Sequence, residues 1–80
     1  MAKWFVYILQ CKDKSLYTGI TNDIEKRFTE HKAGEGSKYV RSRLPIRLVH
    51  SENFKTKSKA LKREAAIKRL TRQQKLKLIK

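Results

Sequence analysis

Bulky residues and short polar segments alternate along the first quarter of the chain, which predicts a β-hairpin. The run from Trp4 to Gln10 is aromatic or β-branched and ends at the polar triplet Lys12-Asp13-Lys14. A second run spans Ser15 to Thr21. If the triplet is a three-residue loop, the two strands pair antiparallel with Tyr7 opposite Gly19, because side chains alternate with a period of two.

Both faces of this predicted hairpin carry apolar side chains. One face would hold Phe5, Tyr7, Leu9, Tyr17 and Gly19, and the other Trp4, Val6, Ile8, Leu16 and Ile20. Since neither face is polar, we expect a sheet that is covered on both sides.

The polar segment after the second run predicts a helix over residues 24–33. Asn22 offers an N-cap, and Glu25 three positions on completes a capping box. Arg27 and His31 lie four residues apart beside the apolar stripe of this helix. Two ionisable side chains are therefore expected to border its buried face.

The rest of the chain predicts one more strand and two more helices. Residues 34–44 are broken by glycine and read as a basic loop, and alternation over 46–52 predicts a third strand. A helix capped by Ser58 is expected through Leu70, and Thr71 to Gln74 form a second capping box that opens a short last helix. The order is β-β-α-β-α-α, an α+β fold with a three-stranded antiparallel sheet flanked by helices. We expect one domain over residues 1–80.

Charge narrows the class of partner. Among 80 residues, 21 Lys and Arg face 7 Asp and Glu, a formal net charge of +14. Residues 55–80 contribute +10 of this, with Glu64 as their only acid. Such a field suits a polyanion, and a phosphate backbone is the usual one. An anionic membrane surface, or a ribosomal location due to charge alone, is the competing interpretation.

Size and cysteine content exclude other classes. The chain is too short for a two-domain enzyme, and its longest apolar run, Trp4 to Leu9, is far below the roughly 20 residues of a membrane span. Its only cysteine, Cys11, cannot form an internal disulfide, and no Cys/His cluster or export leader is evident. We therefore expect a cytoplasmic protein, with association with the nucleoid compatible with its charge.

Glu64 is the most informative single residue. On a wheel of roughly 100° per residue it falls inside the apolar arc formed by Ala60, Leu61 and Ile67. A carboxylate aimed inward is costly unless it meets a partner. An ion pair with Arg27 and a metal ligand at an active site both fit the pattern. Two-metal phosphodiester hydrolysis needs several carboxylates, and few acids are available here.

Five elements of the sequence together resemble a known family. Phe5-Val6-Tyr7 is followed ten residues later by Tyr17-Thr18-Gly19, and then by Arg27, His31 and a helical Glu64. This spacing resembles the GIY-YIG nuclease domain, in particular its small stand-alone bacterial members. The match covers essentially the whole chain, and the family fold agrees with the element order above.

The resemblance implies phosphodiester hydrolysis with one divalent cation. By similarity, Glu64 would hold Mg²⁺ or Mn²⁺, with waters in the other positions. Tyr17 would be the candidate general base, and Tyr7 would orient the water or share that role. Arg27 would neutralise charge on the phosphoryl oxygens, and His31 would assist proton transfer. Without the resemblance, a packed aromatic pair is the more usual interpretation of two tyrosines on one face of a sheet.

The sequence thus supports two functions. The first is a metal-dependent endonuclease that acts on DNA, which is favoured over RNA. It would recognise the structure of its substrate and serve in DNA repair or recombination. The second is a nucleic-acid-binding module that cleaves nothing. No membrane is expected, and a protein partner for substrate targeting is left open. The candidate nucleic-acid contacts are Lys38, Tyr39, Arg41, Arg43, Lys62 and Arg63. Tyr39 is a candidate platform on which a base could stack. The alternative is that its segment is only a flexible charged loop that contains a tyrosine.

Overall fold

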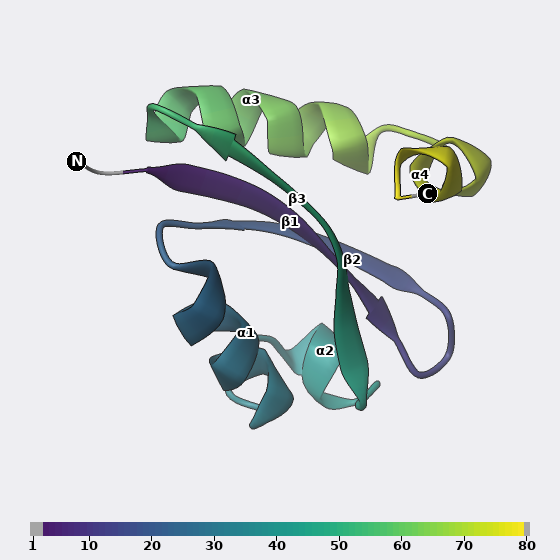
Figure 1. Ribbon diagram of the computed structural model, residues 1–80. Coiled ribbons are helices and arrows are strands. Elements are labelled where there is room, and N and C mark those ends of the chain that lie inside the picture. Colours follow the sequence, from purple (N-terminus) through teal and green to yellow (C-terminus); the bar gives the residue numbers. More distant parts are fainter. Residues whose placement is uncertain (1–2, 80) are drawn as a thin grey trace.

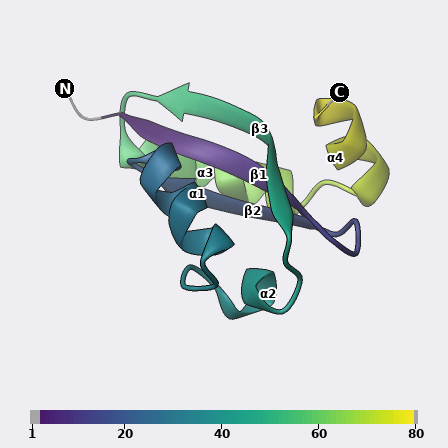
Figure 2. The same ribbon diagram turned by 60° about the horizontal axis from the view of Figure 1, so that its bottom comes forward.

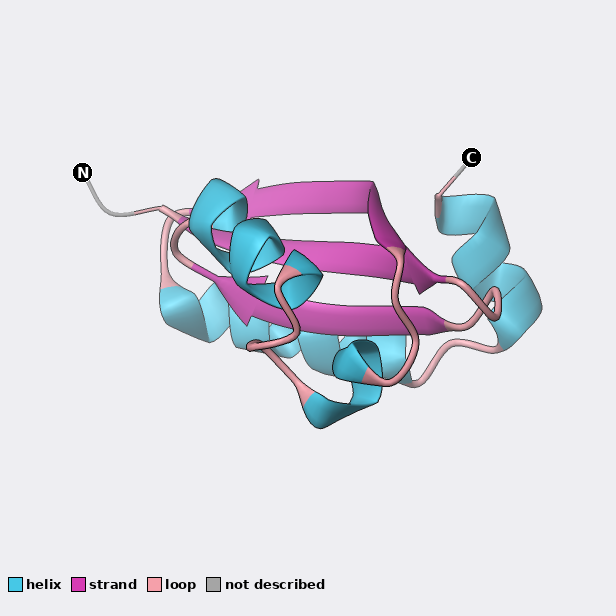
Figure 3. Ribbon diagram, turned by 90° about the horizontal axis from the view of Figure 1, so that it is seen from below, coloured by secondary structure: helices cyan, strands magenta, loops and turns pink. Residues whose placement is uncertain are grey.

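The computed structural model, which describes residues 3–79, is built on one antiparallel sheet of three strands. The strands are β1 (Trp4–Cys11), β2 (Leu16–Thr21) and β3 (Ile46–Phe54). β1 lies in the middle, between β2 and β3 (Figure 3). The central strand therefore contributes side chains to both faces at the middle of the molecule.

The hairpin has the predicted register. Tyr7 pairs with Gly19 and Leu9 with Tyr17, and the backbone N–H of Cys11 donates to the carbonyl of Ser15 at 2.9 Å. The register confirms that Tyr7 and Tyr17 point to the same face of the sheet, as the three-residue loop predicts.

Helices cover both faces of the sheet, as expected (Figure 1). α3 (Lys57–Lys68) and α4 (Arg72–Leu78) pack on one face, and α1 (Ile24–Lys32) lies on the other with the short α2 (Lys38–Arg41). The α+β fold and the order β-β-α-β-α-α are confirmed. The one addition is α2, a single turn within the segment predicted as a loop, which is too short to show helical periodicity.

Each face has its own core. On the α3 side the fully buried residues are Val6, Ile8, Ala60 and Ile67. On the α1 side they are Tyr7, Leu9 and Val40. Leu61, which the helical wheel placed within the apolar arc of α3, is instead 43% exposed. The buried stripe of α3 is therefore narrower than predicted.

The helix starts are shifted by one or two residues from those predicted. Asp23 rather than Asn22 caps α1, and Thr56 rather than Ser58 caps α3, each accepting a hydrogen bond from the N–H three positions on. Asn, Asp, Ser and Thr cap helices about equally well, so sequence alone does not choose between neighbours. The capping box of α4, which begins at Thr71, is confirmed.

The end of α1 is fixed by its backbone and sets the position of His31. Gly34 has a left-handed φ of +82°, its N–H donates to the His31 carbonyl at 3.0 Å, and the Glu35 N–H donates to the Glu30 carbonyl at 2.9 Å. This pair of bonds is the Schellman arrangement, which glycine favours. His31 is thereby held in the last turn of α1.

A bulge changes the faces of β3. The register with β1 shifts between Ile8 and Leu9, so that Leu48 faces Leu9 and His50 faces Ile8. Strict alternation over residues 46–52 would place His50 on the same face as Leu48, and this expectation is wrong because Val49 is an extra residue in the ladder. His50 lies on the side of α3.

On that side an ionic cluster ties β3 to α3. The carboxylate of Glu52 accepts hydrogen bonds from Arg63 Nε at 2.8 Å and Arg63 Nη2 at 3.0 Å, and lies 2.7 Å from His50 Nε2. These bonds, Arg63 foremost, hold the pKa of Glu52 below its ordinary value.

The last helix lies beyond the tip of the hairpin (Figure 2). Arg72 donates through Nη2 to the carbonyl of Lys14 at 2.8 Å, which links α4 to the turn between β1 and β2. Within residues 3–79, no helix has the length and apolar character needed to cross a bilayer.

Candidate active site

Three of the predicted site residues meet on the α1 side of the sheet. Tyr7 from β1 places its hydroxyl 3.0 Å from Nε2 of His31 on α1. The Tyr17 ring from β2 lies edge-on to His31, with centroids 5.4 Å apart, and 6.4 Å from the Tyr7 ring. Residues far apart in sequence thus form a compact group of two phenols and one imidazole.

Two glycines shape this group. A Cβ at Gly19 would lie 2.5 Å from the Tyr7 hydroxyl oxygen, so the phenol can lie against β2 only because position 19 has no side chain. A Cβ at Gly36 would lie 2.5 Å from Nδ1 of His31. The imidazole is 1% exposed, and its Nδ1 has no hydrogen-bond partner among the described residues. The loop after α1 therefore closes over His31.

The protonation states of Tyr7 and His31 are set by burial. Burial above all, with the nearby Tyr17, raises the pKa of Tyr7 to about 12, against the opposing effect of Arg27. Burial, followed by the positive charge of Arg27, lowers the pKa of His31. At neutral pH the phenol is therefore protonated and the imidazole neutral, which allows the phenol to donate to Nε2.

Arg27 lies beside Tyr7 with its guanidinium near the surface. The two residues line the same narrow cavity, together with Phe28 and Leu48. Arg27 Nε is 3.2 Å from Glu30 Oε1, and both side chains are about 40% exposed. Because exposed ion pairs contribute little, this contact leaves the guanidinium free to turn toward an anionic ligand.

Glu64 on α3 is partly buried, with 19% of its side chain exposed. Within residues 3–79 it forms an ion pair with Lys68 Nζ at 3.4 Å, one helical turn away, and the predicted alternative, an ion pair with Arg27, is not formed. The negative charge of Glu64 contributes to the raised pKa of Tyr7. This effect on Tyr7 is the smallest of those acting on that phenol, and it comes from a helix that covers the other face of the sheet.

The donor set around Glu64 fits one hard divalent cation. Within the described part of the chain, no three His, Cys, Asp or Glu side chains lie close enough together to form a metal cage. Mg²⁺ binds readily through one carboxylate with water and substrate oxygens completing its shell. The partly buried Glu64, whose carboxylate lies 3.4 Å from Lys68 Nζ, is a single carboxylate of this kind.

Tyr39 and Arg43 are placed differently from the prediction of free nucleic-acid contacts. The Tyr39 ring stacks with Tyr17 at 6.0 Å between centroids and 28° between planes. The Arg43 guanidinium lies 3.8 Å above the Tyr39 ring and donates through Nε to Asp13 Oδ2 at 3.2 Å. The ring face that Arg43 covers is not available as a stacking platform for a base.

The other predicted contacts fall into two groups. Lys38 and Arg41 on α2 and Lys62 on α3 are exposed. Arg63, by contrast, is committed to Glu52 through two of its nitrogens. Only the first three present cations that an external phosphate could approach directly.

Sequence reasoning did not single out Gly36. It lies in a segment that reads only as a glycine-broken loop, and its close approach to His31 depends on how that loop folds back over α1. The pair of glycines flanking Glu35 is the only feature of the sequence that could have suggested a close backbone approach.

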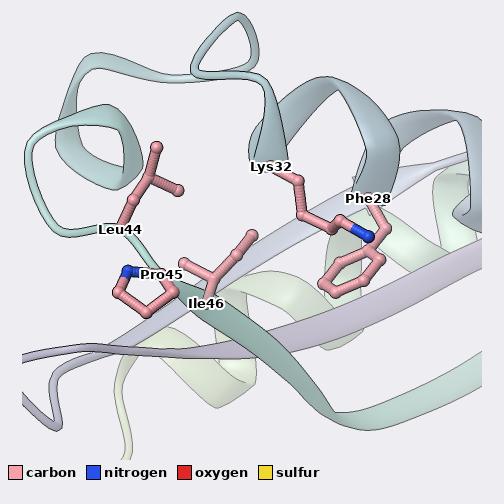
Figure 4. A pocket seen from close by; sticks show the side chains of 5 residues that line it. All are labelled: Phe28, Lys32, Leu44, Pro45 and Ile46. Atoms are coloured by element: carbon pink, nitrogen blue, oxygen red, sulfur yellow. The ribbon is translucent and has the colours of Figure 1, made fainter.

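A pocket on the α1 side of the sheet lies apart from this group. It has a volume of about 540 Å³ and is lined by side chains of α1 and of the segment leading into β3 (Figure 4). The lining residues are Phe28, Lys32, Leu44, Pro45 and Ile46. None of the candidate catalytic residues lines this pocket. The candidate site is therefore identified by the chemistry of its side chains and not by a cavity.

Comparison with known proteins extends these observations. Residues 3–77 match the family model described as the GIY-YIG catalytic domain. A UPF0213 protein of Staphylococcus saprophyticus is 57% identical over 79 residues, which cover 99% of this chain and 96% of that protein. A UPF0213 protein of Haloquadratum walsbyi is 57% identical over 74 residues, covering 92% of this chain and 83% of that protein.

Two solved structures have the same fold. The solution NMR structure of a UPF0213 protein from Bacillus halodurans is 44% identical, with a TM-score of 0.63, and covers 96% of this chain and 82% of that one. The solution NMR structure of a protein from E. faecalis is 45% identical, with a TM-score of 0.64 over 94% of this chain and 80% of that one.

Proposed function

Because the chain belongs to the GIY-YIG family of nuclease domains, we propose that it is an endonuclease that hydrolyses phosphodiester bonds with one bound divalent cation. The observation that supports this most directly is the 3.0 Å contact between the Tyr7 hydroxyl and His31 Nε2, beside the Tyr17 ring. Two phenols and a neutral imidazole in contact can hold and move a proton, which hydrolysis by water requires.

In the proposed reaction a water oxygen forms a bond to phosphorus while the bond from phosphorus to the leaving sugar oxygen breaks. The proton lost by water passes to the Tyr17 oxygen, which must be deprotonated for this step, and the leaving oxygen takes a proton from solvent. Tyr17 is the candidate base on the side of the attacking water. Tyr7, with a pKa of about 12, keeps its proton at neutral pH and therefore orients the water or phosphate by hydrogen bonding.

Charge on the phosphoryl oxygens is neutralised from two sides. The half-exposed Arg27 can leave its surface pair with Glu30 and present a planar fork to two oxygens. Glu64 would hold Mg²⁺ or Mn²⁺, and when bound this ion would supply further positive charge and favour ionisation of a coordinated water.

We propose DNA, more than RNA, as the substrate, and structured or branched DNA in particular, in repair or recombination. The net charge of +14, with no sequence-reading element evident, supports contacts to phosphates over contacts to bases, and therefore recognition of substrate structure. The choice of DNA over RNA follows the family and not the charge. The exposed Lys38 and Arg41 on α2 and Lys62 on α3 are proposed to contact the backbone.

A labelled panel of nucleic acids tests this proposal. Duplex, nicked, flapped and four-way-junction DNA and structured RNA are incubated with Mg²⁺ or Mn²⁺ and wild type, Glu64→Ala or Glu25→Ala. Glu25 is an exposed acid in the first turn of α1 and serves as a control for loss of one negative charge. We expect Glu64→Ala to lower the cleavage rate by about a hundredfold or more, while Glu25→Ala cleaves like wild type.

Two results would contradict the proposal. Equal cleavage by Glu64→Ala and wild type would show that Glu64 holds no required ion. Binding of the panel without cleavage of any member would instead favour the nucleic-acid-binding module, with the basic last third of the chain as its contact surface.

A further inference from the structure

Tyr17 lies on an edge strand, and a residue outside the proposed catalytic group packs against its ring. Tyr39, on the short α2, stacks with Tyr17 at 6.0 Å and a 28° angle between planes. Tyr17 in turn lies edge-on to His31 at 5.4 Å. The Tyr17 ring is thus held between His31 and Tyr39, which limits the side-chain rotations open to it.

Arg43 fixes Tyr39 in that place. Its guanidinium carbon is 3.8 Å above the ring, and its Nη1 donates to the Tyr39 carbonyl at 3.0 Å. The same guanidinium donates to Asp13 in the hairpin turn at 3.2 Å. A backbone bond from the Lys12 N–H to the Arg43 carbonyl, 3.0 Å long, joins the same two segments.

Asp13 is itself held by the turn. Its Oδ1 accepts from the backbone N–H of Ser15 at 3.0 Å and also from the Ser15 hydroxyl. A continuous set of contacts therefore runs from the hairpin turn through Asp13, Arg43 and Tyr39 to Tyr17. The strand that carries Tyr17 and the segment that holds its ring are both attached to one turn.

We propose that Tyr39, and Arg43 acting through it, are positioning residues that set the orientation of the Tyr17 phenol for reaction. This rests on the proposed function, because it assumes that Tyr17 acts on the attacking water. It differs from a role in binding nucleic acid. The Arg43 guanidinium donates to three oxygens, those of Asp13, Tyr39 and Ser42, and covers one face of the Tyr39 ring, so both side chains already have partners within the chain.

The first test is spectroscopic and needs no activity. The chain has three tyrosines, so ring signals in protein labelled at tyrosine and histidine can be assigned with single Tyr→Phe variants. We expect nuclear Overhauser contacts between the Tyr17 ring and His31 in wild type and in Tyr39→Phe, which keeps the ring. They should weaken at least twofold in Tyr39→Leu and in Arg43→Met, because Arg43 acts on Tyr17 through the Tyr39 ring.

The second test separates positioning from binding. Tyr39→Leu and Arg43→Met should lower kcat by about tenfold to a hundredfold, because small misplacements of reacting groups are costly, with the Kd for uncleaved DNA within twofold of wild type. Tyr39→Phe should restore most of kcat. Lys38→Ala, which removes an exposed cation from the same helix, should raise Kd without changing the Tyr17 contacts.

The outcomes distinguish this inference from the proposed function. Unchanged Tyr17 contacts in both variants would overturn the positioning role, as would a raised Kd with unchanged kcat. If wild type cleaves nothing, the proposed function fails and the kinetic role falls with it, whereas the spectroscopic result still decides whether Tyr39 and Arg43 hold Tyr17.

Discussion

Gly36→Ala tests whether the position of His31 matters for activity. Gly36 lies outside the left-handed region, where only Gly34 is found among the glycines, so alanine fits its backbone and the effect arises from the added methyl group. That Cβ would lie 2.5 Å from His31 Nδ1, 2.7 Å from Cε1 and 2.9 Å from Cγ. Ordinary contacts between such atoms begin at about 3.5 Å, so the ring or the loop must move by about 1 Å.

The imidazole is 1% exposed and therefore has little space into which it can move. A shift of this size breaks the 3.0 Å contact between the Tyr7 hydroxyl and Nε2 or compresses it. We expect a loss of stability of about 1–3 kcal/mol, as for other overpacked sites. The cleavage rate should fall by about tenfold to a hundredfold.

Gly34→Ala is the matched control. Gly34 has a φ of +82°, so alanine there is strained and should lower stability by about 1 kcal/mol, while its Cβ would meet Arg41 and not His31. Cleavage of a nicked duplex and urea unfolding are measured for both variants. If Gly36→Ala cleaves at the wild-type rate, or if both variants lose activity in proportion to stability, the argument for a fixed His31 is refuted.

Two further predictions concern stability. Glu52→Gln should lower the free energy of unfolding by about 1–2 kcal/mol at pH 7, since it removes charged hydrogen bonds to Arg63. Because the pKa of folded Glu52 lies below its unfolded value of 4.5, this contribution is present above pH 4.5 and is lost as the pH falls through the folded pKa. Urea titrations should therefore give a higher free energy of unfolding for wild type than for Glu52→Gln at pH 7. The two free energies should converge at pH values below the folded pKa of Glu52. A difference between them that stays the same at every pH would contradict this account. Thr71→Ala should lower the free energy of unfolding by about 1 kcal/mol, because it removes the capping box of α4. Amide hydrogen exchange should become faster in residues 72–78 alone. Faster exchange throughout the protein would refute a local effect.

The pairing of the hairpin strands, and the side chains on each face, could be predicted from the sequence. The length of the loop fixes the register, and side chains alternate between the two faces of a strand. Once Lys12-Asp13-Lys14 is taken as the turn, Tyr7 must face Gly19, and Tyr17 must share its side. His31 beside the buried stripe of α1 followed from helical spacing in the same way. These positions depend on local geometry, which a single sequence carries.

The remaining features depend on contacts between distant segments. The bulge at Val49 moves the His50 side chain to the opposite face of the sheet. The alternation of residue types along β3 gives no sign of this bulge. Glu64 was predicted to point inward, but whether it meets Arg27 depends on helices on opposite faces of the sheet, and Arg27 pairs with Glu30 instead. Tyr39 stacks on Tyr17 in a segment that is bonded to the hairpin turn through Lys12 and Arg43, an arrangement that neither composition nor spacing indicates.

The most direct test of the central claim is the single-turnover cleavage rate of wild type and Glu64→Gln on one prebound DNA substrate, measured across a titration of Mn²⁺. Glutamine keeps the shape of the side chain and removes the charge that would hold the ion. The account predicts a rate that saturates with Mn²⁺ in wild type and falls by about a hundredfold or more in Glu64→Gln, with equal DNA binding. Equal saturable rates in the two proteins would contradict it.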